Sequence, residues 1–236
     1  MEEIEWWEFD SAAELADQAA GDIGFVIESA VEASGSACLA LPGGKTPLPV
    51  YEALVRAPGI DWSKVTILPT DDRIVPLGDP LSNFAMLEGL FAPKGATVIS
   101  LIDEAALDDV QEAGRLADER LKLLKWPLDL VCLGVGTDGH TASIFPGPDF
   151  DRALNGPRER RAIGVRPEPK PAEAPVDRVS LTGAAIASAR ALMIVITGAE
   201  KRRVVEQAVK EGPLSSMPIG RLLGEIDNSV DILWTA

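Results

Sequence analysis

Short apolar runs, separated by longer stretches with helical spacing, dominate the pattern of the chain. Continuous apolar runs at 37–41, 65–68, 128–133 and 192–197 predict buried strands, and a shorter run at 179–182 predicts another. Several of the intervening stretches carry apolar side chains every three or four residues, which is typical of amphipathic helices. Strands that alternate with helices favour a layered α/β fold with a mostly parallel sheet.

Local signals mark where two of the helices begin and end. Ser11 and Glu14 have the spacing of a capping box, and apolar side chains follow at helical spacing until Gly35, which we expect to end the helix. Thr46 is a candidate N-cap, because Pro47 behind it suits the first position of a helix. The glycine-containing turn before Thr46 therefore predicts a strand–turn–helix unit.

Two longer segments complete the outline of the fold. Residues 104–124 have the pattern of one amphipathic helix. Residues 145–178 are rich in proline and charge, and they could form an interdomain linker. We prefer a long surface excursion from a single domain spanning 1–236, because candidate site residues lie on both sides of it.

Composition limits the classes of partner. The 236 residues are 46% hydrophobic and carry a net charge of −15, so nucleic acid and anionic membranes are unsuitable partners. No apolar stretch approaches the roughly 20 residues that span a bilayer. The acidic first residues, 1–6, lack the basic and apolar regions of a signal peptide. We expect a soluble cytoplasmic protein, and nothing in the sequence indicates an obligate protein partner.

The two cysteines, Cys38 and Cys132, both lie in apolar runs predicted to be strands. Neither belongs to a CxxC motif or to a histidine-rich stretch. We expect buried, unreactive thiols in a reducing compartment.

Candidate chemistry gathers in four clusters, each directly after a predicted strand. In open α/β sheets, ligands bind outside the carboxyl ends of the strands. The four clusters could therefore meet at one site, although they lie far apart in the sequence. A small anionic substrate is compatible with the acidic chain, because a few cations and helix N-termini can reverse the field locally.

The first cluster is the glycine turn formed by Gly43, Gly44, Lys45 and Thr46. Glycines let the backbone approach an anion closely, and the following helix offers free N–H groups. An ordinary strand–helix turn that needs glycine for its dihedral angles explains the pattern equally well. The turn matches neither a Walker A loop nor the dinucleotide fingerprint, so it gives little support to nucleotide binding.

The second cluster contains Asp71, Asp72 and Arg73, with Ser82 and Asn83 a short way on. Adjacent carboxylates could orient a histidine, act as a base or hold a divalent metal. Neighbouring side chains in an extended segment point to opposite sides, so Asp71 and Asp72 should not share one role. The alternative is an acidic turn with a solvated ion pair.

The third cluster, residues 134–143, contains His140, the only histidine of the chain, and Asp138. Imidazole is the side chain best suited to move protons near neutral pH, and the glycine-rich surroundings favour a functional role over a structural one. A single histidine without clustered cysteines argues against a zinc site. No GxSxG nucleophile elbow is present for a serine hydrolase triad.

The fourth cluster, residues 198–203, starts a helix with basic side chains, including Lys201. Cations in the first turn oppose the helix dipole at a cost of about 0.3–1 kcal/mol each when exposed. Either one of them faces a bound anion, or they point to solvent and pair with Glu200 or Glu206. Arg178, just before the predicted strand 179–182, is a further cationic candidate.

Together these segments resemble the 6-phosphogluconolactonase family. The resemblance spans nearly the whole chain, in the family's order and spacing, and the His140 segment is its most specific part. It rests on LPGGKTP at 41–47, DDRIVP at 71–76 with Ser82 and Asn83, LGVGTDGHTASIFP at 133–146, and GAEK at 198–201. The resemblance implies a Rossmann-like α/β sheet, related to that of the glucosamine-6-phosphate deaminases.

The activity implied by the resemblance is hydrolysis of 6-phosphogluconolactone, the second step of the oxidative pentose phosphate pathway, without metal or organic cofactor. His140 would be the general base that activates water, and Asp138 or Asp71 would orient it. Arg73 would hold the substrate or offset charge on the developing oxyanion.

The resemblance also implies where the phosphate of the substrate binds. It would lie on the amides of Gly43 and Gly44 with Thr46, Arg178 and Lys201. Two positions depart from the family's usual pattern. Asp72 stands where the family usually has glutamate, and Lys45 stands where it usually has serine, so Lys45 either contacts the phosphate or lies at the rim.

Two other functions stay open. A sugar-phosphate isomerase or deaminase on the same fold would need a glutamate close after the histidine, where this chain has Ile144, Phe145 and Pro146. A sugar-phosphate-binding regulator that has lost catalysis is the second alternative. The presence of His140 and Asp138 argues against it.

Overall fold

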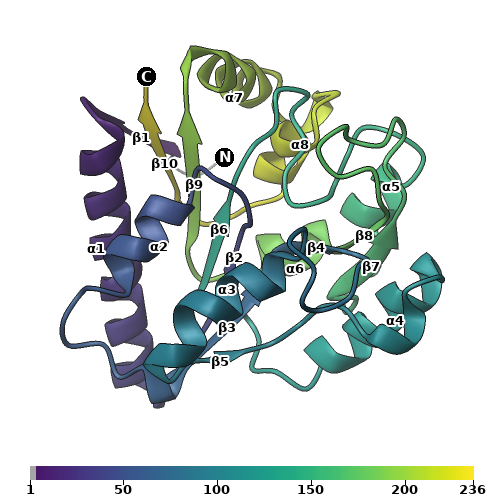
Figure 1. Cartoon of the computed structure of the whole chain (residues 1–236). Helices are drawn as coiled ribbons and strands as arrows, with labels where there is room; N and C mark the ends of the chain where they lie inside the picture. Colours follow the sequence, from purple (N-terminus) through teal and green to yellow (C-terminus); the bar gives the residue numbers. More distant parts are fainter. Residues whose placement is uncertain (1–3) are drawn as a thin grey trace.

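The four long apolar runs expected to be strands are neighbours in the centre of one parallel sheet. In the computed structural model, which describes residues 4–236, the strand order is β1-β10-β9-β6-β2-β3-β5, and all neighbours are parallel (Figure 1). The strands are β1 (Ile4–Phe9), β2 (Ala37–Leu41), β3 (Val65–Pro69), β5 (Thr97–Val98), β6 (Leu130–Leu133), β9 (Leu192–Thr197) and β10 (Val230–Thr235). The expected mostly parallel α/β sheet is confirmed. The prediction that residues 1–6 are not part of a signal peptide partly concerns residues 1–3, which lie outside the described residues.

Helices cover both faces of this sheet (Figure 1). One hydrophobic core lies beneath α1 (Ala12–Ser34), α2 (Leu48–Leu54) and α3 (Asn83–Phe91). The other lies beneath α4 (Val110–Leu121), α5 (Phe150–Leu154), α6 (Gly183–Ala187), α7 (Ala199–Glu211) and α8 (Pro218–Gly224). Alternate residues of β2 enter the two cores, Leu39 on one side and Ala40 on the other. Burial on both faces explains why the central strands are continuous apolar runs.

Short 3₁₀ turns connect several elements, at Trp62–Lys64, Ala92–Lys94, Glu104–Ala106 and Gly212–Leu214. The single helix predicted over 104–124 is wrong in its first part. The helix proper begins only at Val110, because the carboxylate of Asp109 accepts hydrogen bonds from the N–H groups of Gln111 and Glu112 and so caps α4.

The predicted bounds of α1 are confirmed, whereas those of α2 are not. The Ser11 hydroxyl accepts the N–H of Glu14 at 3.2 Å, and Gly35 ends α1 with a φ of +82°. Helix α2 begins one residue later than expected. Pro47 is its N-cap, and no side chain makes a capping hydrogen bond there. A cap at Thr46 would accept from the N–H of Leu48 or of residue 49, and Pro49 has no N–H to donate.

A second, antiparallel sheet of three strands lies beside the main one, formed by β4 (Asp71–Arg73), β8 (Arg178–Leu181) and β7 (Ala162–Val165). Strand β7 lies in the segment expected to be a surface excursion, and it is fully buried, so that expectation is wrong for its centre. The close approach of α4 explains the burial. A Cβ at Gly164 would come 1.8 Å from the Val110 carbonyl oxygen, and a Cβ at Gly114 would come 2.0 Å from the Gly164 nitrogen.

Cys38 and Cys132 are buried in β2 and β6 as free thiols, and burial raises the pKa of each to about 12. Such thiols stay protonated and unreactive at neutral pH. No helix within residues 4–236 combines the length and apolar character that a membrane crossing requires.

Candidate active site

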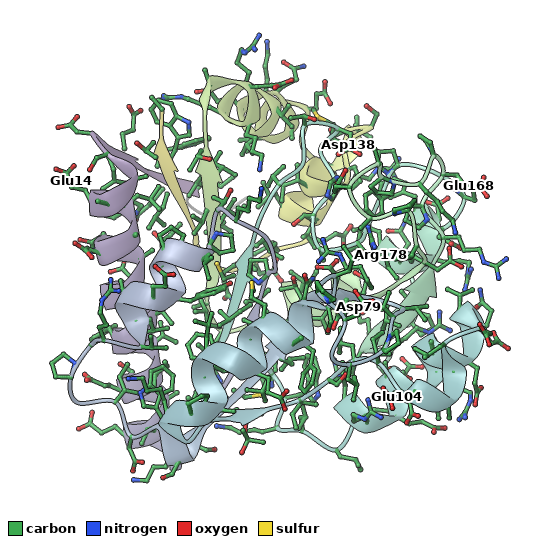
Figure 2. All side chains as sticks on the ribbon, in the orientation of Figure 1. Glu14, Asp79, Glu104, Asp138, Glu168 and Arg178 are labelled. Carbon is green, nitrogen blue, oxygen red and sulfur yellow. The ribbon has the colours of Figure 1, made fainter. Side chains whose placement is uncertain are left out.

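The four clusters expected to meet do follow four adjacent strands. Strands β9, β6, β2 and β3 are consecutive in the sheet and parallel, so their carboxyl ends lie along one edge. In that order they lead to the start of α7 with Lys201, the His140 loop, the Gly43 turn and β4. In Figure 2, Asp138 is labelled near the upper end of the sheet, toward which β9 and β10 point in Figure 1.

The loop that carries His140 is a tight glycine turn. The Gly136 N–H donates to the His140 carbonyl oxygen at 2.9 Å, and the Gly139 N–H donates to the Gly136 carbonyl oxygen at 3.0 Å. Gly139 has a φ of +79°, a conformation that favours glycine. Its carbonyl oxygen accepts the N–H of Ile219, so the start of α8 supports the loop. The histidine is therefore presented on a braced backbone.

Asp138 and His140 form a close pair within this loop. His140 Nδ1 lies 2.5 Å from Asp138 Oδ1, and the same oxygen accepts the His140 backbone N–H at 3.1 Å. Burial alone would raise the pKa of Asp138, but the hydrogen bonds and charge of His140 outweigh it, and the pKa is lowered. An ionised carboxylate only accepts hydrogen bonds, so Nδ1 carries the hydrogen and Nε2 is the basic nitrogen.

Two residues fix the plane of the imidazole. The Phe145 ring packs against it with centroids 4.4 Å apart and an interplanar angle of 32°. On Gly136, an added Cβ would come 2.2 Å from His140 Cε1 and Nδ1, so only glycine leaves room for the ring. Together with the bond to Asp138, these contacts restrict the ring to one orientation.

Asp71 has a different partner. Its Oδ2 accepts the hydroxyl of Ser143 at 2.5 Å, and the Ser143 N–H donates to the Ser180 hydroxyl at 3.1 Å. Asp71 and Ser180 are opposite each other on β4 and β8. Ser143 follows Ala142, whose φ of +48° is unusual for a residue other than glycine. The Asp71 contact thus ties the end of the histidine loop to the small sheet.

Asp72 points away from Asp71, as the extended segment predicted, and it is completely buried. Its carboxylate accepts the N–H groups of Arg73, Asn83 and Phe84 at 2.7–3.0 Å and the Ser82 hydroxyl at 3.1 Å. Burial raises its pKa to about 6, against the opposing effect of these backbone hydrogen bonds. Asp72 therefore accepts N–H groups in the first turn of α3, whose N-cap is Ser82.

Arg73 and Arg178 are opposite each other on β4 and β8. Arg178 is 3% exposed, and its Nη2 donates to the Ala174 carbonyl oxygen at 2.9 Å. Arg73 Nη1 donates to the Leu81 carbonyl oxygen at 3.0 Å and to the Asn83 side-chain oxygen. Arg73 Nε and Arg178 Nη1 are buried and find no hydrogen-bond partner among residues 4–236. Two neighbouring cations with unused N–H groups are typical of an anion site.

Electrostatics at Arg178 agree with this geometry. Burial and then repulsion from Arg73 lower the pKa of Arg178, while Asp71 acts in the opposite direction. A guanidinium stays charged in a protein, so this pair of cations favours the binding of an anion rather than the loss of a proton.

The glycine turn lies against Asn83, whose side-chain oxygen accepts a hydrogen bond from Arg73. A Cβ on Gly43 would come 1.9 Å from the Asn83 side-chain oxygen, so glycine is required by close approach. Gly44 has a φ of +102° and is exposed, Lys45 is exposed, and Thr46 is partly buried. Lys45 makes no hydrogen bond or ion pair with any other described residue, which is consistent with a place at the rim.

The basic start of α7 divides into two kinds of side chain. Arg202 pairs with Glu8 and Glu206, both at 2.7 Å, and its guanidinium lies 4.3 Å from the Trp234 ring centroid. For Arg202, therefore, the second of the two interpretations of this basic cluster is correct: its side chain forms ion pairs, one of them with Glu206, as expected. Lys201 forms no ion pair within the part of the chain that the structure describes, and burial lowers its pKa. Arg203 is exposed, whereas Lys201 is partly buried, so Lys201 is the cation of this turn that we expect to contact an anion.

Sequence patterns gave no role to four side chains that the structure brings into the site: Asn83, Ser143, Phe145 and Ser180. The first three lie in quoted motifs, so their positions were noticed but their partners were not. The contacts of Ser143 and Ser180 depend on the pairing of β4 with β8, which neither periodicity nor spacing reveals. The contacts of Asn83 depend also on where α3 begins, whereas Phe145 contacts His140 within one loop.

The chain is similar to known proteins over nearly its whole length. Residues 10–234 match the family described as glucosamine-6-phosphate isomerases/6-phosphogluconolactonase. The chain is 34% identical over 228 residues to the 6-phosphogluconolactonase of Rhizobium meliloti, covering 96% of both chains. It is 35% identical over 233 residues to that of Mesorhizobium japonicum, covering 97% of this chain and 94% of the relative. The crystal structure of a 6-phosphogluconolactonase from Shewanella baltica superposes with a TM-score of 0.90 at 30% identity, covering 100% of this chain and 99% of that one.

Proposed function

The chain belongs to the family of glucosamine-6-phosphate isomerases and 6-phosphogluconolactonases, and we propose that it hydrolyses 6-phospho-D-glucono-1,5-lactone to 6-phosphogluconate. One observation carries the proposal. The loop that holds a histidine paired with a carboxylate is hydrogen-bonded through Ser143 to β4, and β4 carries Arg73 opposite Arg178, two arginines with unused N–H groups. A proton acceptor beside an anion site is the arrangement that hydrolysis of a phosphorylated lactone requires.

His140 activates the attacking water. With Nδ1 held by Asp138, the ring accepts a proton from water through Nε2, and the water oxygen forms a bond to C1 of the lactone. The electrons of the carbonyl double bond move to its oxygen, which becomes negatively charged. Asp138 keeps the reactive tautomer and stabilises the imidazolium that forms.

Ring opening completes the reaction. The tetrahedral intermediate collapses, the bond from C1 to the ring oxygen breaks, and the imidazolium returns its proton to that oxygen. The atoms of one water molecule are thereby added to the ester, and His140 is regenerated as a base. This sequence uses only water and protein side chains, so the proposal includes no cofactor and no metal.

Phosphate binding holds the lactone in place. The proposed subsite contains Arg178, Lys201, Thr46 and the amides of Gly43 and Gly44. Lys45 lies at its rim. Fixing the phosphate positions the carbonyl carbon relative to His140, and part of the barrier is then met by binding energy. We assign this activity to the second step of the oxidative pentose phosphate pathway in the cytoplasm.

A deaminase or isomerase on the same fold has less support. That chemistry needs a carboxylate beside the histidine, and the corresponding place here holds Phe145, whose ring packs on His140. A regulator that binds but does not hydrolyse is the other alternative. The close Asp138–His140 pair favours catalysis over it.

The proposal is tested by measuring lactone hydrolysis, with 6-phosphogluconolactone generated in place by glucose-6-phosphate dehydrogenase. Unphosphorylated gluconolactone, run in parallel, reports the contribution of the phosphate. We expect the protein to accelerate hydrolysis well above the spontaneous rate and to prefer the phosphorylated lactone. A rate equal to the spontaneous one, with tight binding of 6-phosphogluconate, would instead identify a binding regulator.

A further inference from the structure

Asn83 lies at the junction of three segments of the site. It is 4% exposed and starts α3. Its Nδ2 donates to the Asp71 carbonyl oxygen at 2.7 Å, and its Oδ1 accepts from Arg73 Nη1. The same side chain fills the space beside Gly43. One amide therefore contacts β4, the guanidinium of Arg73 and the glycine turn.

Hydrogen bonds at the start of α3 fix the position of Asn83. Its backbone N–H donates to Asp72 Oδ1 at 2.7 Å, and the Ser82 hydroxyl caps α3 by accepting the N–H of Ala85 at 3.1 Å. Asp72 is completely buried and receives further hydrogen bonds at the same helix start. The amide of Asn83 consequently has little freedom to move, and neither does the guanidinium bound to it.

Arg73 is held in a specific way. Its Nη1 is shared between the Leu81 carbonyl oxygen and Asn83, while its buried Nε has no hydrogen-bond partner among the described residues. Arg178, opposite it, has the same property at Nη1. Without Asn83, only the bond to the Leu81 carbonyl oxygen would hold the Arg73 guanidinium against the repulsive charge of Arg178.

We propose that Asn83 is a positioning residue that holds Arg73 beside Arg178 and the Gly43 turn, so that the two guanidiniums together bind the phosphate of the substrate. The identity of that anion rests on the proposed function. A phosphate monoester carries close to two negative charges at neutral pH and three acceptor oxygens, which matches two cations with unused donors. The inference gives Arg73 a phosphate-binding role and leaves the oxyanion to other groups.

The contact with Gly43 favours the phosphate over the oxyanion. Asn83 touches Arg73 and the glycine turn at once, and the amides of that turn are suited to a compact anion. The histidine, by contrast, is fixed by Asp138, Phe145 and Gly136, and none of these contacts Asn83. Loss of Asn83 should thus weaken phosphate binding more than it disturbs the proton transfer.

The test compares Asn83→Asp, Asn83→Ala and a matched control, Asn228→Ala. Asn83→Asp keeps the size of the side chain and an acceptor for Arg73, but adds a negative charge beside the anion site. Asn228 also donates its amide to a backbone carbonyl, that of Ala189 at 2.9 Å, outside the site. For both Asn83 variants we expect KM for the phosphorylated lactone and Ki for inorganic phosphate to rise about tenfold or more, with kcat nearly unchanged.

Unphosphorylated gluconolactone separates the phosphate from the oxyanion. Its kcat/KM should change less than about twofold in both Asn83 variants, and Asn228→Ala should match wild type throughout. Equal losses for the two lactones would place the effect at the oxyanion and overturn the inference, as would an unchanged KM and Ki.

Arg73→Lys provides a second test in case the Asn83 variants do not fold, because it leaves Asn83 and the start of α3 unchanged. Lysine keeps the charge but loses the fork, so it should show the same phosphate-selective loss. If wild type does not hydrolyse the lactone, calorimetry with inorganic phosphate and 6-phosphogluconate still tests whether Asn83 supports anion binding. Weaker binding by Asn83→Asp than by wild type would then support the anion site while the proposed function fails. Equal binding would overturn the inference.

Discussion

His140 Nδ1 lies 2.5 Å from Asp138 Oδ1, and the two residues belong to one turn, separated only by Gly139. The same carboxylate oxygen also accepts the backbone N–H of His140. The orientation of the imidazole is therefore set within the turn and does not depend on Asp71, whose carboxylate binds Ser143. Of the two candidates that the sequence left open, Asp138 has the contact that an orienting group requires.

Asp138→Asn should lower kcat on the order of 10²-fold while KM changes little. The neutral amide no longer selects the tautomer with hydrogen on Nδ1, and it does not stabilise the imidazolium. Initial rates, corrected for spontaneous hydrolysis, give kcat and KM separately. A variant with wild-type kcat would show that Asp138 does not act through His140.

Gly136→Ala should reduce kcat about tenfold or more, because its Cβ would overlap the His140 ring at 2.2 Å and approach Asp138 Oδ1 at 2.7 Å. Gly134→Ala is the matched control, since a Cβ there meets nothing within 4 Å. Both proteins should have similar melting temperatures and similar KM values. If the two alanines are equally active, the imidazole plane is not critical.

Lys201→Ala should raise KM for the phosphorylated lactone about 10- to 100-fold, the range expected for a lost hydrogen bond to a charged group. The unphosphorylated lactone should be unaffected. Arg203→Ala removes an exposed cation from the same helix turn and tests whether general attraction is enough. Equal KM increases in both variants would mean that Lys201 makes no specific contact. Measurements at two salt concentrations separate screening from direct binding.

Asp72 should make the protein less stable as the pH rises. Burial raises its pKa to about 6 from the 3.8 of an exposed aspartate. Its contribution to stability is thus fully present below about pH 3.8 and is lost as the pH rises through about 6. The shift corresponds to about 3 kcal/mol.

Asp72→Asn removes this titration and leaves the other carboxylates common to both proteins. The free energy of unfolding of wild type minus that of the variant should fall by about 2 kcal/mol between about pH 4 and pH 7. Urea titrations at several pH values measure it. A pH-independent difference would mean that the carboxylate is ionised throughout, held so by its backbone donors.

Much of the fold could be predicted from the sequence, because burial on both faces produces continuous apolar runs. Strands β2, β3, β6 and β9 were found in this way. Strand β1 was missed because its apolar residues are interrupted by Glu5 and Glu8 at the edge of the sheet. Strand β5 is only two residues long. Strand β7 was missed because its surroundings are rich in proline and charge, and only the contact with α4 shows its burial.

The segments that form the site could be predicted from the sequence, but the contacts between their side chains could not. Segments that follow parallel strands were correctly expected at one edge, since topology alone dictates it. The partners of Asp71 and Asp72 could not be predicted, because they depend on where α3 begins and how β4 pairs with β8. The role of Asn83 depends on both.

The proposed mechanism depends on His140 as the base. The most direct test is to measure the kcat of His140→Ala for 6-phosphogluconolactone, with the spontaneous rate subtracted. Binding of 6-phosphogluconate by calorimetry shows whether the variant is folded and competent. If His140 is the base, kcat falls at least about 10²-fold while the affinity for 6-phosphogluconate is retained. A variant that keeps wild-type kcat would contradict the role of His140 as the base, and the search for the base would then turn to Asp71.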